Sequence, residues 1–307
     1  MKPPLQSATG RAFARAGLLG NPSDAYAGKA IAFSVRNFSA RVSVEPSDRS
    51  VIGDQTVAPL LEATLARYAS HAGTRLQPLR IDVESDIPFQ VGLSGSSAIV
   101  IAALRALAAA HGSELSPFDQ AELALAVEVE DLGIAAGPMD RVVQAYEGLY
   151  LMDFRSERTP GAYTPLDPGM LPPMLIVWDP SGGASSGVVH ADVRERWRRG
   201  DPDLRRAMER FPQLVDAGID ALRQGDFARF RTAVDRNFDH RCEWFPVADR
   251  DREMVAIARA RGAGAKQCGS GGACLVVLTS QAQAPTLDSD YRLAGYRTLR
   301  PVIEDPT

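Results

Sequence analysis

A short glycine- and serine-rich loop is the segment of this sequence best suited to hold a phosphate group. It runs directly into the alanine-rich stretch 98–110, which has the composition of a helix. A helix start presents free backbone N–H groups and the positive end of the helix dipole, and glycine lets an anion approach closely. The candidate nucleotide-binding residues are Gly92, Ser94, Gly95, Ser96 and Ser97. Neither GxxxxGK[ST] nor GxGxxG is present, and a flexible turn with a serine cap is the alternative reading of the loop.

Glu128 is a candidate metal ligand in the next helical stretch. At 100° per residue it shares a helix face with Ala124 and Leu125, whereas Glu130 projects among polar residues. A buried carboxylate is costly unless it is paired or bound to a metal, and Ser97 would complete a Mg²⁺ site beside a triphosphate. The pattern therefore makes Glu128 a candidate metal ligand and Ser97 a candidate Mg²⁺ ligand, with an ion pair between Glu128 and an arginine as the alternative.

Asp140 is a candidate catalytic base. It follows a Gly-Pro pair and precedes Arg141, so the sequence predicts a loop at this point. A carboxylate beside a cation can accept the proton of a substrate hydroxyl. An ordinary turn aspartate is the alternative.

Two further segments carry groups suited to a sugar and a phosphate. Segment 15–29 is polar and rich in turn residues, and it is predicted to be a loop before a strand hairpin. Its candidate residues are Arg15, Asn21, Asp24, Tyr26 and Lys29. A second glycine-rich loop, 266–272, contains Gly269 and Gly271 and precedes a strand. Taken separately, each segment is also compatible with an ordinary turn.

The composition is that of a folded protein with no overall charge to attract nucleic acid or an anionic membrane. The chain has 307 residues, 34 of them basic and 38 acidic, for a formal net charge of −4, and 45% are hydrophobic. Its three cysteines contain no CxxC pair, which favours a reducing compartment over a disulfide framework or zinc cluster. No signal-peptide core or stretch of about 18 apolar residues is present. A cytoplasmic protein with no nucleic-acid or membrane partner is expected, and its oligomeric state, monomer or dimer, is left open.

The order of the expected elements indicates an α+β fold. Strands are predicted at 31–35 and 40–44, joined as a hairpin, and at 79–83, 149–154, 174–178, 273–279 and 298–302. Helices are predicted at 98–110, 116–133, 188–199, 203–224 and 250–261. Strict alternation of strand and helix is absent, which disfavours a doubly wound nucleotide fold. The proline-rich stretch 159–173 is the predicted boundary between domains 1–168 and 169–307.

Four segments together resemble the motifs of the GHMP kinases, the galactokinase, homoserine, mevalonate and phosphomevalonate kinase superfamily. Residues 15–20 resemble the first motif, R-x-x-L-x-G, and residues 92–98 resemble the phosphate loop. Residues 266–272 resemble the K-x-x-G-x-G-G loop, and residues 128–140 resemble the catalytic segment E-x4-G-x3-G-x2-D. The joint match, in this order along the chain, is far more specific than any single motif.

The resemblance implies an ATP-dependent kinase with Mg²⁺ as its metal. It implies a ribosomal S5 domain 2-like N-terminal domain over 1–168, carrying the ATP, Mg²⁺ and phosphate-loop sites, and a ferredoxin-like C-terminal domain over 169–307. By the same resemblance, Asp140 is the base, Glu128 binds Mg²⁺, and Arg15 stabilises the transferring phosphoryl group.

The acceptor implied by the resemblance is a sugar acid. The pattern is most similar to members that phosphorylate the anomeric C1 hydroxyl of D-glucuronate, with Asp24 binding sugar hydroxyls. Lys29, Arg141 and Arg194 are the candidate cations for the carboxylate. Asn21-Pro22 replaces the usual Glu-His after Gly20, which argues against galactose or mevalonate as the acceptor. A neutral hexose, a heptose phosphate or an amino sugar are alternative acceptors, and a sensor without catalysis is the alternative of another class.

Overall fold

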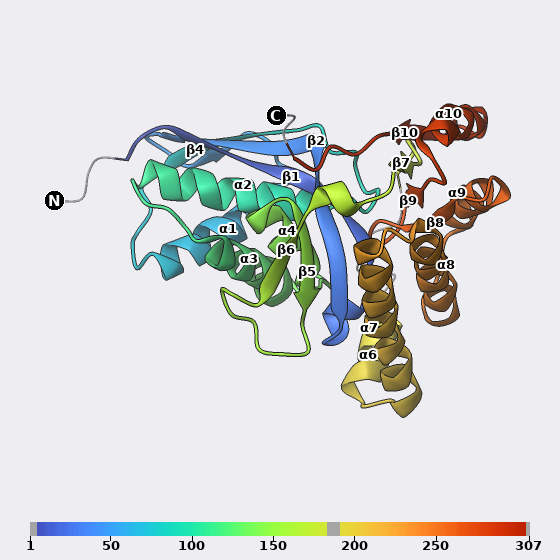
Figure 1. Ribbon diagram of the computed structural model, residues 1–307. Helices are drawn as coiled ribbons and strands as arrows, with labels where there is room; N and C mark the ends of the chain where they lie inside the picture. Colours follow the sequence, from blue (N-terminus) through green and yellow to red (C-terminus); the bar gives the residue numbers. More distant parts are fainter. Residues whose placement is uncertain (1–4, 183–190, 305–307) are drawn as a thin grey trace. The chain divides into compact units, whose positions relative to one another are not determined.

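The computed structural model describes residues 5–182 and 191–304, which form two compact units (Figure 1). Each unit is assembled from several segments of the chain. Unit 1 comprises Met1–Ala14, Arg36–Ile87 and Ser94–Glu147. Unit 2 comprises Arg15–Val35, Pro88–Leu93 and Gly148–Thr307. The boundary expected between residues 168 and 169 stays a prediction, because units defined by packing need not coincide with folding domains.

One sheet contains six strands, in the order β3-β4-β2-β5-β6 with β1 also paired to β2. The strands are β1 (Ala8–Leu19), β2 (Lys29–Pro46), β3 (Val51–Ile52), β4 (Leu79–Ser85), β5 (Leu149–Asp153) and β6 (Tyr163–Leu166). Strand β2 pairs antiparallel with β5 from Lys29↔Asp153 to Phe33↔Leu149. It pairs antiparallel with β4 from Ala40↔Ser85 to Pro46↔Leu79, while β3 runs parallel to β4.

The predicted hairpin at 31–44 is wrong, because these residues belong to the single long strand β2. Its first part has β5 as a partner and its last part has β4, so ladder hydrogen bonds keep the backbone extended at both ends. Apolar alternation continues along the strand, and this pattern alone does not distinguish one long strand from two short ones.

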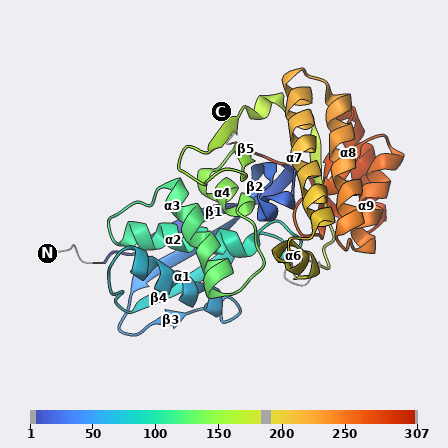
Figure 2. The same cartoon turned by 90° about the horizontal axis from the view of Figure 1, so that it is seen from below.

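The helices of unit 1 lie on one face of its strands (Figures 1 and 2). They are α1 (Ala58–His71), α2 (Gly95–Ala110), α3 (Pro117–Ala126), a π-helical turn (Val127–Asp131) and α4 (Met139–Tyr146). Helix α2 carries small and apolar residues on all sides and is almost wholly buried. Its backbone packs so closely that a side chain at Gly10 would lie 2.0 Å from the Ala102 carbonyl oxygen. Ser116 caps α3, accepting from the Asp119 backbone N–H.

Unit 2 has its own antiparallel sheet, in the order β10-β7-β9-β8. Its strands are β7 (Met174–Trp178), β8 (Gly264–Gln267), β9 (Ala273–Val277) and β10 (Arg297–Leu299). Its helices are α6 (Ala191–Arg198), α7 (Pro202–Arg223), α8 (Phe227–Trp244), α9 (Asp249–Ala260) and α10 (Ala284–Leu293). Short 3-10 turns occur at Ser23–Tyr26, Pro168–Met170 and Gln281–Gln283.

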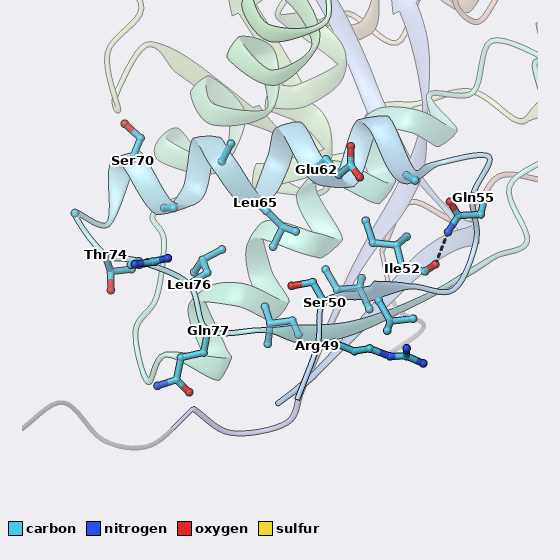
Figure 3. Close-up of a pocket in the computed structure, with 18 residues that line it drawn as sticks. Arg49, Ser50, Ile52, Gln55, Glu62, Leu65, Ser70, Thr74, Leu76 and Gln77 are labelled. Carbon is cyan, nitrogen blue, oxygen red and sulfur yellow. Dashed lines mark hydrogen bonds between the residues drawn. The ribbon is translucent and has the colours of Figure 1, made fainter. Parts of the chain in front are cut away.

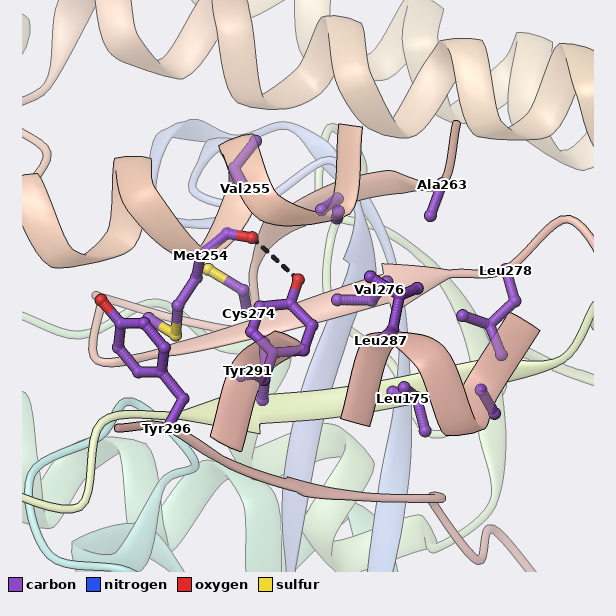
Figure 4. Packing of buried hydrophobic residues seen from close by; sticks show 14 of the residues in the cluster. Leu175, Met254, Val255, Ala263, Cys274, Val276, Leu278, Leu287, Tyr291 and Tyr296 are labelled. Atoms are coloured by element: carbon purple, nitrogen blue, oxygen red, sulfur yellow. Dashed lines mark hydrogen bonds between the residues drawn. The ribbon is translucent and has the colours of Figure 1, made fainter. Parts of the chain in front are cut away.

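The core of unit 2 lies between its sheet and helices α9 and α10. Figure 4 shows Leu175 and Val276 of the sheet packed beside Leu287 and Tyr291 of α10. The buried Tyr291 hydroxyl donates to the Met254 carbonyl at 2.8 Å. The apolar core therefore accommodates this hydroxyl without leaving it unpaired.

The structure confirms the α+β class and most of the predicted elements. The predicted helix 188–199 corresponds to α6, although residues 188–190 lie outside the described residues. Strands β1, β3, β6 and β8 and helices α1, α4, α8 and α10 were not predicted. Among the described residues, no helix is both long enough and apolar enough to cross a membrane.

Candidate active site

A cavity of about 1030 Å³ lies in unit 1 and contains none of the predicted site residues. Figure 3 shows Leu65 of α1 above Ile52 of β3, with Leu76 from the loop that precedes β4. Its lining is largely apolar and lacks paired carboxylates or a glycine-rich loop. This cavity is therefore not the candidate active site.

The phosphate loop, residues 92–97, leads into α2 of unit 1, and its serine hydroxyls face the predicted carboxylates. Gly92 and Leu93 belong to unit 2, and the loop enters unit 1 at Ser94. The Ser94 hydroxyl donates to Asp140 Oδ2 at 2.5 Å. Gln144 Nε2 donates to the Ser94 carbonyl at 3.0 Å and to the Phe13 carbonyl at 2.8 Å, which holds the loop in place. The first N–H groups of α2 have no intrahelical acceptor, as at any helix start.

Asp140 lies in the first turn of α4, so the prediction that it lies on a loop is wrong. Pro138 is the N-cap residue of α4. Proline is tolerated at a helix start because the N–H that it lacks would have no partner inside the helix there. The helix gives the Asp140 carboxylate a fixed direction toward Ser94. A base placed in this way is available to a hydroxyl held against the phosphate loop.

Glu128 is fully buried, as its predicted helix face requires, whereas Glu130 is exposed. Ser97 Oγ lies 3.1 and 3.3 Å from the Glu128 carboxylate oxygens, and Ser96 Oγ lies 3.1 Å away. Glu128 also forms an ion pair with Arg141, whose Nη1 donates to the Gly137 carbonyl at 2.8 Å. The sequence offered a metal site or an arginine ion pair as alternative explanations for the burial of Glu128. The structure has both the serine oxygens of such a metal site and the arginine partner.

The oxygen donors around Glu128 fit a magnesium ion. Mg²⁺ prefers a few protein oxygens completed by water and phosphate, and Glu128 with Ser97 supplies such a pair. No group of three or more His, Cys, Asp or Glu side chains suited to a metal occurs in residues 5–182 and 191–304. The site therefore suits a metal that arrives with a nucleotide rather than one held by protein side chains alone.

In unit 2, Arg15 lies on strand β1 and not in the predicted loop, and it is 4% exposed. Its Nη1 donates to the Gly92 carbonyl at 2.6 Å and to the Cys268 carbonyl at 3.4 Å. Arg15 therefore links the start of the phosphate loop to the second glycine-rich loop. A side chain at Gly269 would lie 2.3 Å from the Gly92 carbonyl, so glycine is required there for the two loops to meet.

Lys266 is a buried cation with a complete set of acceptors, and it is 1% exposed. Its Nζ donates to Asn21 Oδ1 at 2.6 Å, to the Gln267 carbonyl at 2.7 Å and to the Gly17 carbonyl at 3.0 Å. Burial lowers the pKa of Lys266 to about 7. The predicted substrate residue Asn21 is therefore engaged by Lys266.

Asp24 and Tyr26 share the 3-10 turn Ser23–Tyr26, and both are buried. The Tyr26 ring packs edge-on against Trp197 of α6, with centroids 5.3 Å apart, and against Phe245 at 6.2 Å. Burial raises the pKa of the Tyr26 hydroxyl to about 12, opposed by the charges of Arg194 and Arg241 and assisted by Asp24. This turn thus brings a carboxylate, a phenol and two cations near one point of unit 2.

Two of the three predicted carboxylate-binding cations have acidic partners of their own. Lys29 pairs with Asp216 at 2.5 Å, and Arg141 pairs with Glu128. Arg194 is half-buried on α6 and acts on Tyr26. Gly271 adopts a φ of +138°, and a side chain there would lie 2.7 Å from Asp251 Oδ2.

Sequence reasoning missed the residues that α8 and α9 contribute to unit 2. Asn237 Oδ1 accepts from the Gly20 N–H at 2.7 Å, and Asp251 accepts from the Gly272 N–H at 2.8 Å. Arg241 is 1% exposed and lies above the Phe245 ring. The available signal was periodicity, because Arg241 interrupts the apolar stripe Phe230, Val234, Phe238 and Phe245 at helical spacing.

Comparisons with known proteins agree with this arrangement. Residues 59–148 match the family described as GHMP kinases N terminal domain. Glucuronokinase 1 of Arabidopsis thaliana is 35% identical over 97% of this chain and 92% of its own length. Probable glucuronokinase 2 of the same plant is 34% identical, with 97% and 91% covered. The galactokinase structure from Lactococcus lactis superposes with a TM-score of 0.83 at 12% identity, over 97% of this chain and 93% of that one.

The chain therefore belongs to the GHMP kinase family. The full-length similarity to glucuronokinases and the superposition on a galactokinase together confirm the predicted fold class.

Proposed function

We propose that this protein transfers the γ-phosphoryl group of ATP to the anomeric C1 hydroxyl of D-glucuronate. By family the chain is an ATP-dependent sugar kinase, and the finer statement concerns its acceptor. The observation that carries the proposal is the convergence of Ser94, Ser97, Glu128 and Asp140 at the start of α2. The full-length similarity to glucuronokinases supports the choice of acceptor.

The phosphate loop and the start of α2 bind the triphosphate in this proposal. Free backbone N–H groups and the serine hydroxyls donate to phosphate oxygens, and the helix dipole adds a favourable potential. Arg15 holds the Gly92 carbonyl, so the loop keeps the shape that exposes these donors. Phosphoryl transfer depends mainly on positioning and on stabilisation of charge, and this loop serves both.

Asp140 acts as the base toward the acceptor hydroxyl. Its carboxylate takes or orients the anomeric proton, and the hydrogen bond from Ser94 fixes the direction of one of its oxygens. Asp24, in the buried turn of unit 2, binds other hydroxyls of the sugar.

Glu128 and Ser97 would hold Mg²⁺ when a nucleotide is bound, and the ion would neutralise charge on the phosphate oxygens. Arg141 neutralises Glu128 in the arrangement described here. It keeps the buried carboxylate from standing uncompensated and orients it toward Ser97.

The test is ADP release from MgATP against D-glucuronate, D-galacturonate, glucose, galactose and N-acetylhexosamines, with the phosphorylated carbon identified by ³¹P NMR. Turnover of glucuronate with a C1 phosphate is expected. Activity confined to neutral or amino sugars would keep the kinase and overturn the uronate acceptor. Silence on the whole panel, in a protein that binds MgATP, would favour a heptose phosphate acceptor or a sensor without catalysis.

A further inference from the structure

Arg241, in the last turn of α8, is a buried cation with donor capacity to spare. Its guanidinium carbon lies 5.6 Å from the centroid of the Phe245 ring, and Nη2 donates to the Ser270 carbonyl at a long 3.4 Å. Its Nε has no hydrogen-bond partner within residues 5–182 and 191–304. An arginine has five N–H donors and a buried one normally satisfies them, so Arg241 retains donor capacity for a further acceptor.

The acidic residues near Arg241 leave part of its charge unneutralised. Asp251 is occupied, since it accepts from Gln267 Nε2 at 2.5 Å and from the Gly272 N–H at 2.8 Å. Burial lowers the pKa of Arg241 to about 10, although Asp251 and Asp24 oppose this shift. A buried cation in this state favours an incoming anion.

The surroundings of Arg241 have the composition of a site for a sugar acid. Arg194 and Arg241 both act on the Tyr26 hydroxyl, and Asp24 lies in the same turn as Tyr26. The ring of Tyr26 packs against Trp197 of α6, the helix that carries Arg194. An aspartate suits the hydroxyls of a sugar, and arginine suits its carboxylate in a bidentate pair.

We propose that Arg241 binds the C6 carboxylate of the uronate acceptor, with Arg194 as a second cation on α6, the helix whose Trp197 packs against Tyr26. This inference rests on the proposed function and names the residues that select the acceptor. It replaces Lys29 and Arg141 as the cations for the carboxylate, because both already pair with acidic side chains.

The experiment compares D-glucuronate with D-glucuronamide, which has a neutral amide in place of the carboxylate. Steady-state kcat and KM are measured for both sugars with the wild type, Arg241→Met and Arg194→Met. Arg241→Met should raise KM for glucuronate by about 30–100-fold and leave glucuronamide and ATP within about threefold, because only the charged contact is lost. Arg194→Met should give the same pattern with a smaller change of about 3–10-fold.

Arg259→Met is the matched control. Arg259 also lies over a phenylalanine of α8, with its guanidinium carbon 5.4 Å from the Phe238 centroid, and it pairs with Asp235 and Asp239. Its loss should leave the preference for glucuronate over glucuronamide unchanged. If Arg241→Met shows no cooperative unfolding transition, Arg241→Lys decides, since it keeps a buried cation but loses the bidentate fork.

The outcomes separate this inference from the proposed function. A wild type that releases no ADP with glucuronate overturns the proposed function and, with it, this inference. An active wild type whose preference for glucuronate survives in folded Arg241→Met or Arg241→Lys overturns this inference alone. A preference lost in Arg241 variants and retained in Arg259→Met supports it.

Discussion

The two units of this protein bury charge in different ways. In unit 1, the carboxylate of Glu128 is matched by the guanidinium of Arg141. In unit 2, Lys266 and Arg241 donate mainly to backbone carbonyl oxygens and amide groups. Dipoles satisfy hydrogen bonds but leave the net charge in place, whereas an opposite charge removes it.

This difference matches the tasks proposed for each unit. The charge of Glu128 in unit 1 is largely cancelled by Arg141, so the pair creates only a weak electrostatic field. The carboxylate becomes available when Arg141 moves or a metal binds, which suits a site that must accept a metal–nucleotide complex. In unit 2, Arg241 keeps its positive charge at neutral pH because its pKa stays near 10, which suits an anionic acceptor.

Asp140→Asn should have the largest effect, because it removes the only proton acceptor that the proposal places at the phosphate loop. We expect kcat to fall by about 10²–10⁴-fold, the usual contribution of a positioned acid or base. Equilibrium binding of MgATP should remain close to that of the wild type. Glu130→Gln is the control, since Glu130 is exposed and pairs with Arg67. A wild-type kcat in Asp140→Asn would remove Asp140 from the role of base.

Glu128→Gln tests the ion pair of unit 1. The substitution removes the nearer of the two carboxylates that face the buried Arg141 and leaves only Asp140, whose Oδ2 lies 3.6 Å from Arg141 Nη1, so the free energy of unfolding should fall by about 3–5 kcal/mol. Glu128→Gln/Arg141→Met should recover part of that loss, because no uncompensated charge remains. Urea unfolding measures the stability of the single and the double variant. In Glu128→Gln, the Mg²⁺ concentration at the midpoint of MgATP binding should rise by about 10–100-fold. Equal stability of the single and double variants would contradict a charge-based partnership.

Lys266→Met tests the dipole-held cation of unit 2. The substitution removes the three hydrogen bonds that Lys266 Nζ donates to Asn21 Oδ1 and to two carbonyl oxygens, which should cost about 2–3 kcal/mol of unfolding free energy. Lys266→Met already removes the hydrogen bond between Lys266 and Asn21 Oδ1. Adding Asn21→Ala should therefore lower the free energy of unfolding little further. Thermal unfolding of both variants checks this, and a strong further loss in the double variant would contradict it.

The smallest expected effect is a pH dependence at Asp179 in unit 2. The hydrogen bond from Arg250 Nε, 2.7 Å away, lowers the pKa of Asp179 to about 2 from its ordinary 3.8. Because the folded-state pKa is depressed, the stabilisation is complete above about pH 4 and is lost as the pH falls toward 2. Arg250 is half exposed, so we expect only about 1 kcal/mol.

Arg250→Met provides the measurement for Asp179. Urea titration measures the free energy of unfolding of the wild type and of Arg250→Met at each pH. The difference between them should shrink as the pH is lowered from 5 to 2.5. A difference that stays constant over this range would show that the pair does not respond to protonation of Asp179.

The unit 1 part of the site was largely predictable, because its chemistry is local in sequence. Glu128 and Asp140 lie on two short helical segments that follow the phosphate loop, so spacing and the helical wheel placed Glu128 inside and Glu130 outside. The errors concerned local structure. Asp140 was expected on a loop and Arg15 in a turn, because turn-forming neighbours outweighed the signals for helix α4 and strand β1.

The sequence by itself determined the motifs, the inward face of Glu128 and the α+β class, because these follow from residue type and from periods of 2 and 3.6 residues. The tertiary structure alone decided which charges meet. Arg141 reaches Glu128 across a turn, and Arg241 lies near Tyr26 although more than 200 residues separate them. Such contacts depend on how helices pack on the sheet, and no local pattern of residues encodes that packing.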